Sequence, residues 1–286
     1  MAIVMSFSGP VDRVMGGGMG ILQMNVTDEK DVKVGAKYIE DIEGKLNILV
    51  NKFVYGAHGS LLPYTNLFIA GSHGPDFTSE KYSAENPFEP QTVQNRADLF
   101  MLNTIVLFFI ICAIQSLLVK GASSHLQGMS SIINISSIAA KLNTSLPMVS
   151  VAYGVTEAAL DKLALVLAMS FGGRGISIWV NMLQPGLFSL EMVPPEFLEA
   201  LKTELLPGQV TLIPVRRHGN AETGMMAFYL VVSDYTNGAV LSADGGLLLV
   251  NPWPVSVSDA VLPWNQPVSL STSSSACRTS ERLSSH

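Results

Sequence analysis

The feature that most constrains the fold of this chain is the alternation of strand-like and helix-like segments along it. Short apolar runs bounded by turn residues predict strands at residues 21–26, 46–50, 131–135, 176–183 and 239–242. Longer stretches between them predict helices at residues 29–43, 97–119, 153–170 and 221–232, with a short acidic helical segment near 195–205. Such alternation is typical of a parallel sheet with helices on both faces, so we expect an α/β, Rossmann-like three-layer fold.

The composition predicts one domain followed by a tail. The chain has 286 residues, of which 48% are hydrophobic, which is enough for one large core. Residues 54–90, rich in Gly, Ser and Pro, are predicted to form a long loop or lid. From about Asn251 the composition shifts to Pro and Ser, so we expect a domain over residues 1–250 and a disordered tail over residues 251–286.

Charge and cysteine usage exclude several classes of protein. The net charge is −6 and the basic residues are scattered, so a nucleic-acid partner is not expected. Cys112 and Cys277 offer neither a disulfide framework nor metal-ligand spacing, which predicts no metal site and a reducing compartment. The N-terminus lacks the basic start of a signal peptide, so we expect a cytoplasmic protein.

The uncharged segment over residues 99–119 permits two interpretations. It is long enough to span a bilayer. Against a span, it contains the polar residues Asn103, Thr104, Gln115 and Ser116, and no basic cluster flanks it. We favour a helix buried between the sheet and a subunit interface, and therefore a homo-oligomer without a membrane partner.

One strand, loop and helix carry the most specific pattern in the chain. The apolar run from Ile132 ends in Asn134-Ile135-Ser136-Ser137, and Tyr153-Gly154-Val155-Thr156-Glu157 begins sixteen positions after Ser137. This arrangement resembles the catalytic segment of the classical short-chain dehydrogenases/reductases. In that family the tyrosine donates a proton to a carbonyl, the serine hydrogen-bonds the substrate oxygen, and a lysine four residues after the tyrosine lowers its pKa. The resemblance implies that Tyr153 is the acid/base and that Ser137 orients the carbonyl, while Glu157 stands at the lysine position.

Further landmarks of the family follow in the right order between about Gly20 and Gly246. Asn25-Val26 resembles the residues after the third strand that contact the adenine ring, and Asn51 resembles the start of the family's Asn-Asn-Ala-Gly motif beside the cofactor. Lys52-Phe53-Val54 replaces the remainder of that motif. Asn103 matches the asparagine on the long helix that bends the backbone and anchors a proton-relay water.

The nicotinamide side of the predicted cofactor site follows a strand. Pro185-Gly186 matches the family turn against the nicotinamide. Leu190 stands where a threonine or serine would bond the carboxamide, and Ser189 is the possible substitute. Asp244-Gly245-Gly246 matches the turn after the last strand, a largely structural feature.

The first part of the family pattern has no clear counterpart. The family begins with a strand, a Gly-x-x-x-Gly-x-Gly turn that holds the pyrophosphate, a helix and a second strand. Only about twenty residues precede Asn25, and Gly16 to Gly20 is interpreted as a connector rather than a phosphate cradle. Residues 2–7 are a candidate replacement for the first strand. We therefore expect a Rossmann-like fold that lacks part of its first βαβ unit. Such a chain should bind its cofactor more weakly than a family member with the complete unit.

The carboxylate at position 157 bears on the chemistry of Tyr153. Residues four apart on a helix share a face, and a like charge beside a tyrosine raises its pKa from about 10. Two other lysines are candidates to replace the family lysine. Lys162 lies on the opposite face of this helix, and Lys141, in a predicted loop, is less constrained in position but has no identified partner. Glu157 could itself bond the ribose hydroxyls of a cofactor.

The resemblance implies an oxidoreductase that uses NAD or NADP and acts on a small-molecule carbonyl or alcohol substrate. The first alternative is a catalytically inactive pseudoenzyme, or an incomplete gene product, that dimerises through the helices at 99–119 and 153–170. The second is a membrane-associated protein that uses the uncharged helix. Whether the chain is an active enzyme is left open at this stage.

Overall fold

The computed structural model describes residues 2–6, 19–52, 93–124, 128–142, 151–188, 199, 202–204 and 212–250. The chain divides into two compact units, residues 1–254 and 255–286, and every described residue belongs to the first. The predicted lid at 54–90, the predicted tail at 251–286 and most of the acidic segment near 195–205 lie outside the described residues.

A four-stranded parallel sheet forms the centre of the first unit. Its strands, in the order in which they lie side by side, are β3 (Ile48–Asn51), β4 (Ser130–Ile135), β5 (Ile178–Pro185) and β6 (Val240–Ala243). In the register, Asn51 pairs with Asn134, and Met182 on β5 pairs with Asn134 on one side and Val240 on the other. The two central strands are buried along nearly their whole length, as expected for a parallel sheet covered on both faces. The α/β, Rossmann-like prediction is confirmed.

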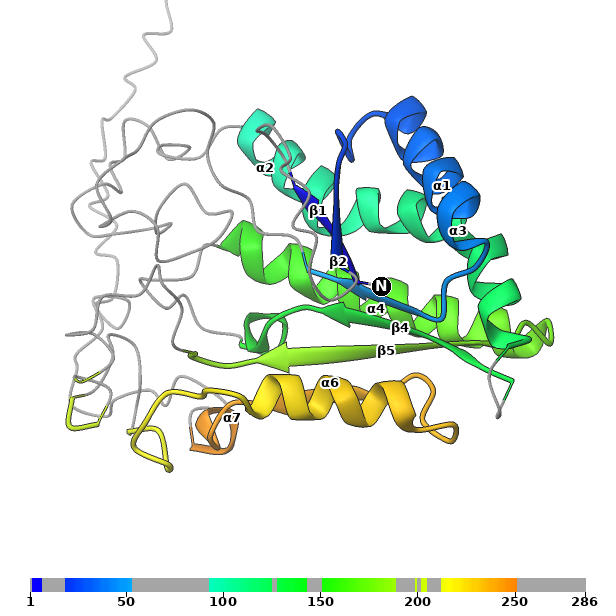
Figure 1. The fold of residues 1–286 in the computed structure, drawn as a ribbon. Helices are drawn as coiled ribbons and strands as arrows, with labels where there is room; N and C mark the ends of the chain where they lie inside the picture. The colour runs from blue at the N-terminus through cyan, green and yellow to red at the C-terminus, as the bar shows by residue number, and fades with distance from the viewer. Residues whose placement is uncertain are drawn as a thin grey trace, which may run out of the picture. The chain divides into compact units, whose positions relative to one another are not determined.

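Helices cover both faces of this sheet (Figure 1). The helices α3 (Val106–Ala122) and α4 (Val151–Gly173) pack on one face, and α6 (Glu222–Val232) packs on the other. The main apolar core lies between the sheet and the helices α3 and α4, and includes Ile110, Leu118 and Ile132. A smaller core joins Ile133 and Leu183 to Leu230 on α6.

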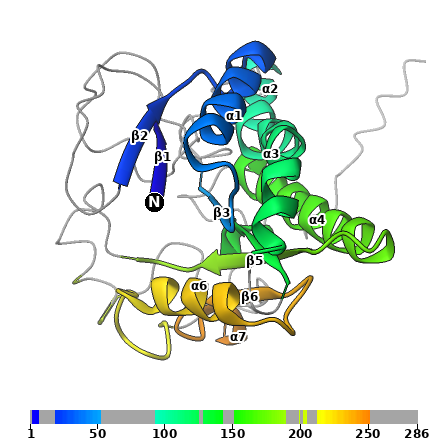
Figure 2. The same ribbon diagram turned by 45° about the vertical axis from the view of Figure 1, so that its right-hand side comes forward.

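The helix α1 (Glu29–Glu43) has the bounds that the sequence predicts. The side chain of Asp28 accepts a hydrogen bond from the Lys30 amide at 2.8 Å and so caps its first turn. Gly44 ends it with a φ of 68°, the left-handed conformation that glycine adopts without strain. Its buried face contacts α3 (Figure 2), and Glu40 pairs with Lys120 at 2.7 Å.

The predicted helix at 97–119 is longer and is interrupted. It runs as α2 (Val93–Phe100), a π-helical turn labelled η2 (Met101–Ile105), and then α3. The described helix from Arg96 to Ala122 is long and apolar enough to cross a membrane, and half of its most apolar window is buried within the protein. Length and composition alone do not distinguish a span from a core helix, and this helix contributes Ile110, Ile111 and Leu118 to the core.

The N-terminal strands differ from the prediction. The strand expected at 21–26 is β2 (Met19–Gln23), followed by a turn over residues 26–27. It pairs in parallel with β1 (Ala2–Ser6) in a separate two-stranded sheet. The candidate replacement strand at the N-terminus therefore forms, but within the described residues it does not join the central sheet. Ile48 and Val50 on β3, one of the two outer strands of the described sheet, are 37% and 49% exposed.

Candidate active site

Ser137 and Tyr153, the two residues at the centre of the sequence pattern, lie where parallel strands end and α4 begins. Ser136 and Ser137 follow β4, and Tyr153 lies in the first turn of α4. The carboxyl ends of parallel strands are the usual place for ligands in sheets of this kind, because the loops that follow them diverge there. The fold thus brings the two halves of the sequence pattern to one edge of the sheet.

Ser137 and Tyr153 lie together at this edge. Ser137 caps the short 3-10 helix η3 (Ile138–Ala140), and its hydroxyl accepts a hydrogen bond from the Ala139 amide at 3.1 Å. A side chain at Gly154 would place its Cβ 3.1 Å from the Ala139 carbonyl oxygen, so the start of α4 packs closely on η3. The Ser137 hydroxyl hydrogen-bonds the half-buried Tyr153 side chain. The two hydroxyl groups are therefore next to each other at the carboxyl edge of the sheet.

The environment of Tyr153 holds its phenol in the protonated form. Burial raises the pKa of Tyr153 well above its ordinary value of 10, and the charge of Glu157 raises it further. The hydrogen bond with Ser137 opposes both effects by favouring the phenolate. The direction is the one argued from the sequence, although burial, which the sequence argument did not include, is the larger cause.

Glu157 is a buried carboxyl at the centre of the cluster. The residue is 4% exposed, and its Oε1 accepts a hydrogen bond from Asn103 Nδ2 at 3.3 Å. Its other oxygen, Oε2, is buried and has no hydrogen-bond partner among the described residues. Burial raises the pKa of Glu157 to about 7; the negative charge of Asp161 adds to this rise, and the positive charge of Lys52 opposes it. Glu157 therefore titrates close to neutral pH.

Asn103 connects the interrupted helix to α4. It lies in the π-helical turn, is 4% exposed, and also donates from Nδ2 to Thr156 Oγ1 at 3.1 Å. Thr156 in turn donates to the Tyr153 carbonyl oxygen at 2.8 Å, and Thr104 donates to the Thr156 carbonyl oxygen at 3.2 Å. A π-helical turn often marks a functional position in a helix, because the widened turn re-aims its side chains. Here it directs the Asn103 amide to the face of α4 that carries Glu157.

A second polar network, which the sequence analysis missed, lies beside the first. Asp161 accepts hydrogen bonds from Ser136 Oγ at 2.7 Å and from Gln184 Nε2. Gln184 Oε1 accepts from Ser242 Oγ at 2.8 Å, and Ser242 Oγ accepts from Lys141 Nζ at 3.0 Å. Asp161 is four residues after Glu157, so helical periodicity could have identified it. The structure also identifies a partner for Lys141, which the sequence did not, namely Ser242.

Three residues predicted to lie beside the cofactor, Asn51, Pro185 and Gly186, are at strand ends. Asn51 is 5% exposed and donates from Nδ2 to Asn134 Oδ1 at 2.7 Å across β3 and β4. The Nδ2 atom of Asn134 is buried and has no hydrogen-bond partner among the described residues. Pro185 ends β5, and the Gly186 amide donates to Ala243 at 2.8 Å. A Cβ at Gly186 would lie 2.7 Å from the Asp244 Cα, so only glycine fits this turn.

Asn25 and Val26 have structural roles in the described residues. Asn25 is exposed, and its Oδ1 accepts hydrogen bonds from the Thr27 amide at 3.1 Å and the Thr27 hydroxyl at 2.7 Å. Val26 is 3% exposed and packs in the main core. Their contacts do not join them to the Tyr153 cluster. Ser189 and Leu190 lie outside the described residues.

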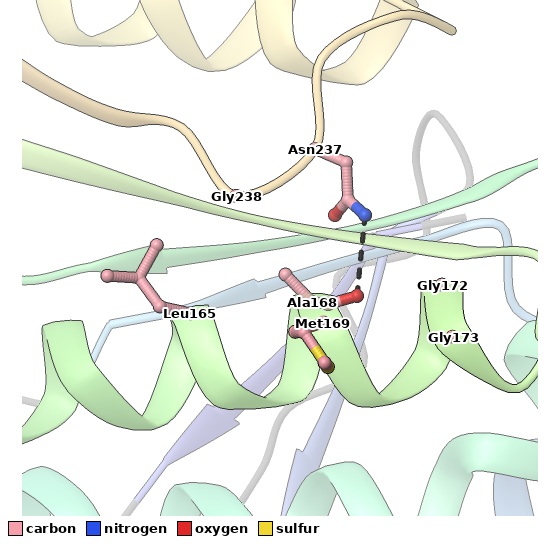
Figure 3. Close-up of a pocket in the computed structure, with 7 residues that line it drawn as sticks. All are labelled: Leu165, Ala168, Met169, Gly172, Gly173, Asn237 and Gly238. Atoms are coloured by element: carbon pink, nitrogen blue, oxygen red, sulfur yellow. Dashed lines mark hydrogen bonds between the residues drawn. The ribbon is translucent and has the colours of Figure 1, made fainter.

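Glu157 does not line either of two hollows in the surface. The first is an open, apolar hollow at the far end of α4, where Asn237 Nδ2 donates to the Ala168 carbonyl oxygen at 3.4 Å (Figure 3). It lies about 20 Å along the helix from Tyr153 and is lined by no titratable side chain. The second is lined by the ends of β5 and β6, including Leu187 and Asp244, and carries the Arg217–Glu222 ion pair. Within the described part of the chain, no group of three or more His, Cys, Asp or Glu residues could hold a metal ion.

Comparisons with known proteins agree with this arrangement. A sequence model of a family described as enoyl-(acyl carrier protein) reductase, of the short-chain dehydrogenase type, matches residues 85–248. No curated protein sequence matches the chain.

Solved structures give the same fold. The Pseudomonas aeruginosa RhlG/NADP active-site complex matches with a TM-score of 0.60 at 23% identity, over 81% of this chain and 77% of that chain. A putative short-chain dehydrogenase/reductase from Burkholderia xenovorans matches with a TM-score of 0.60 at 20% identity, over 82% and 78% of the two chains. A short-chain type dehydrogenase/reductase from Mycobacterium ulcerans matches with a TM-score of 0.58 at 21% identity, over 83% and 73%. Because the family match spans more than half of the chain and agrees with the fold, the chain belongs to the short-chain dehydrogenase/reductase family of oxidoreductases.

Proposed function

We propose that this chain is a nicotinamide-dependent reductase of carbonyl compounds, with Tyr153 as proton donor and Ser137 as the residue that orients the carbonyl. The observation that carries the proposal is the hydrogen-bonded Ser137–Tyr153 pair at the carboxyl edge of the sheet, beside the buried Asn103–Glu157 contact. A carbonyl oxygen placed between the two hydroxyl groups would accept a hydrogen bond from each.

The described residues fit the nicotinamide and ribose half of NAD or NADP. The close Gly186–Asp244 approach leaves a turn without side-chain bulk, and the unpartnered Oε2 of Glu157 is an acceptor suited to a ribose hydroxyl. The bound cofactor would supply the hydride. Weakened binding, which we expect because Lys52-Phe53-Val54 replaces a family motif, stays a prediction.

The protonation of Tyr153 favours one direction of the reaction. Because the pKa of Tyr153 is raised, the phenol remains protonated at neutral pH and can give its proton to the developing alkoxide. Oxidation of an alcohol would need the phenolate as base, which burial and Glu157 both disfavour. We therefore expect reduction of a carbonyl at neutral pH and little oxidation of the corresponding alcohol.

A second candidate is a pseudoenzyme that binds ligands without turnover. The carboxylate at Glu157 supports it, because a negative charge destabilises the phenolate that remains on Tyr153 after proton transfer.

A single-turnover experiment separates the two candidates. The full chain is mixed with NADH or NADPH and a set of aldehydes and ketones, and the loss of cofactor absorbance is followed. The proposal expects slow reduction that Tyr153→Phe abolishes and that Ser137→Ala reduces by about 10²-fold or more. Cofactor binding by calorimetry, without hydride transfer to any carbonyl, would instead support the pseudoenzyme.

A further inference from the structure

Among the residues that the structure describes, none forms an ion pair with the buried Glu157 carboxyl. Only one of its oxygens is hydrogen-bonded, and that bond comes from the neutral amide of Asn103. A buried carboxylate with one unsatisfied oxygen is costly unless an opposite charge acts on it, since the protein interior screens charge poorly. Some group must therefore compensate Glu157 if it is to be ionised in the folded protein.

The charged and titratable groups around Glu157 come from two elements. From α4, Tyr153 and Asp161 face it, and Asp161 is negatively charged when ionised. From the end of β3, Lys52 acts on Glu157 with a positive charge, and the effect is mutual. The η2 turn contributes the neutral amide of Asn103. Lys141, although at the same edge, acts on Asp161 and not on Glu157.

The position of Lys52 is defined by the strand before it. The Asn51 side chain is bonded to Asn134 in the neighbouring strand, which holds the end of β3 in register. Lys52 follows directly, at the sheet edge where Tyr153 and Glu157 lie. The residue is exposed, although nearby protein desolvates its ammonium enough to lower its pKa. Its long side chain can thus adjust toward Glu157 without leaving the surface.

We propose that Lys52 is a positioning residue of this site, which supplies from the end of β3 a positive charge that favours the carboxylate form of the buried Glu157 over the neutral acid. The inference rests on the proposed function, because it assigns a role within the same site. It also links two departures from the family pattern: the helix carries a carboxylate in place of the lysine, and the strand end carries a lysine in place of an asparagine. As a carboxylate, Glu157 presents Oε2 as an acceptor for a ligand hydroxyl; as a neutral acid, it would present a donor.

The test is a titration of Glu157 in the full chain without cofactor or substrate. The protein is labelled with ¹³C at the glutamate side-chain carboxyl carbons, and the Glu157 signal is assigned by its loss in Glu157→Gln. We expect Lys52→Met to raise the midpoint of this signal by about one pH unit, as the loss of one nearby unit charge requires. Lys52→Arg keeps the charge and should keep the wild-type midpoint.

The matched control is Lys141→Met, which removes a lysine from the same sheet edge. It should leave the Glu157 midpoint unchanged. An unchanged midpoint in Lys52→Met, or equal shifts in Lys52→Met and Lys141→Met, would overturn the proposal. Lys52→Gln repeats the test if the Met variant does not fold. Because no cofactor is present, a chain that fails to bind NAD(P)H or to turn over refutes the proposed function without deciding this inference.

Discussion

Replacement of Glu157 by glutamine should change how the stability of the protein depends on pH. Glu157 has a pKa of about 7 in the folded chain against an ordinary value of 4.5, so the folded chain binds this proton more tightly than the unfolded chain does. The resulting stabilisation is fully present below about pH 4.5 and is lost as the pH rises through about 7. The glutamine side chain keeps the shape and can accept the same hydrogen bond from Asn103, but it does not titrate.

The pKa shift of Glu157 sets the size of this change in stability. A folded-state pKa of about 7 against an ordinary value of 4.5 corresponds to about 3 kcal/mol of stabilisation at low pH. Between pH 5 and pH 8.5 the wild-type chain should lose about 2.5 kcal/mol of unfolding free energy that the variant retains. Urea unfolding at the two pH values, followed by circular dichroism, measures the difference for both proteins.

Two outcomes would refute this reasoning. If the variant and the wild type differ by the same amount at both pH values, Glu157 does not titrate between them and its burial has been misjudged. If the variant is less stable than the wild type by a larger amount at pH 8.5 than at pH 5, the pKa of Glu157 is depressed rather than raised. Glu40→Gln is a control with the opposite sign, because the Lys120 side chain lowers the pKa of that exposed carboxyl and its stabilisation is lost as the pH falls.

Three further predictions concern catalysis, packing and assembly. With cofactor saturating, Glu157→Lys should raise the rate of carbonyl reduction about tenfold or more, because a cation stabilises the Tyr153 phenolate. Adding Tyr153→Phe should remove this gain. Equal reduction rates for the wild type and Glu157→Lys would contradict the argument. Gly121→Ala should lower the free energy of unfolding by about 1–3 kcal/mol in urea unfolding, because the added Cβ would lie 1.9 Å from the Leu46 carbonyl oxygen. A variant as stable as the wild type would show that the backbone shifts at little cost. We expect a homodimer through α3 and α4, whose exposed apolar side chains include Phe109 at 48% exposure. Light scattering should detect a dimer that Phe109→Glu dissociates. A monomeric wild type would contradict the predicted dimer.

The strands and helices of the central unit could be predicted because their signals are local. The helix at 29–43 has the bounds that the sequence predicts, and the structure shows that Asp28 and Gly44 cap its two ends. The strands β4 and β5 are apolar runs, and the 3.6-residue period of α4 shows that Glu157 lies beside Tyr153. The resemblance implied a bend in the helix at Asn103, but the π-helical form of that turn could not be predicted, because it coincides with long-range contacts to Thr156 and Glu157.

The sequence by itself determined the order of the elements and the spacing of Ser137 and Tyr153, because both depend on residues close together in the chain. Only the tertiary structure decided which charges act on Glu157. Lys52 is more than a hundred positions before it, and only parallel pairing of β3 with β4 brings the end of β3 to the edge of the sheet where α4 begins. The placement of β2 in a separate sheet was likewise decided by strand pairing, which depends on partners that a local pattern does not specify.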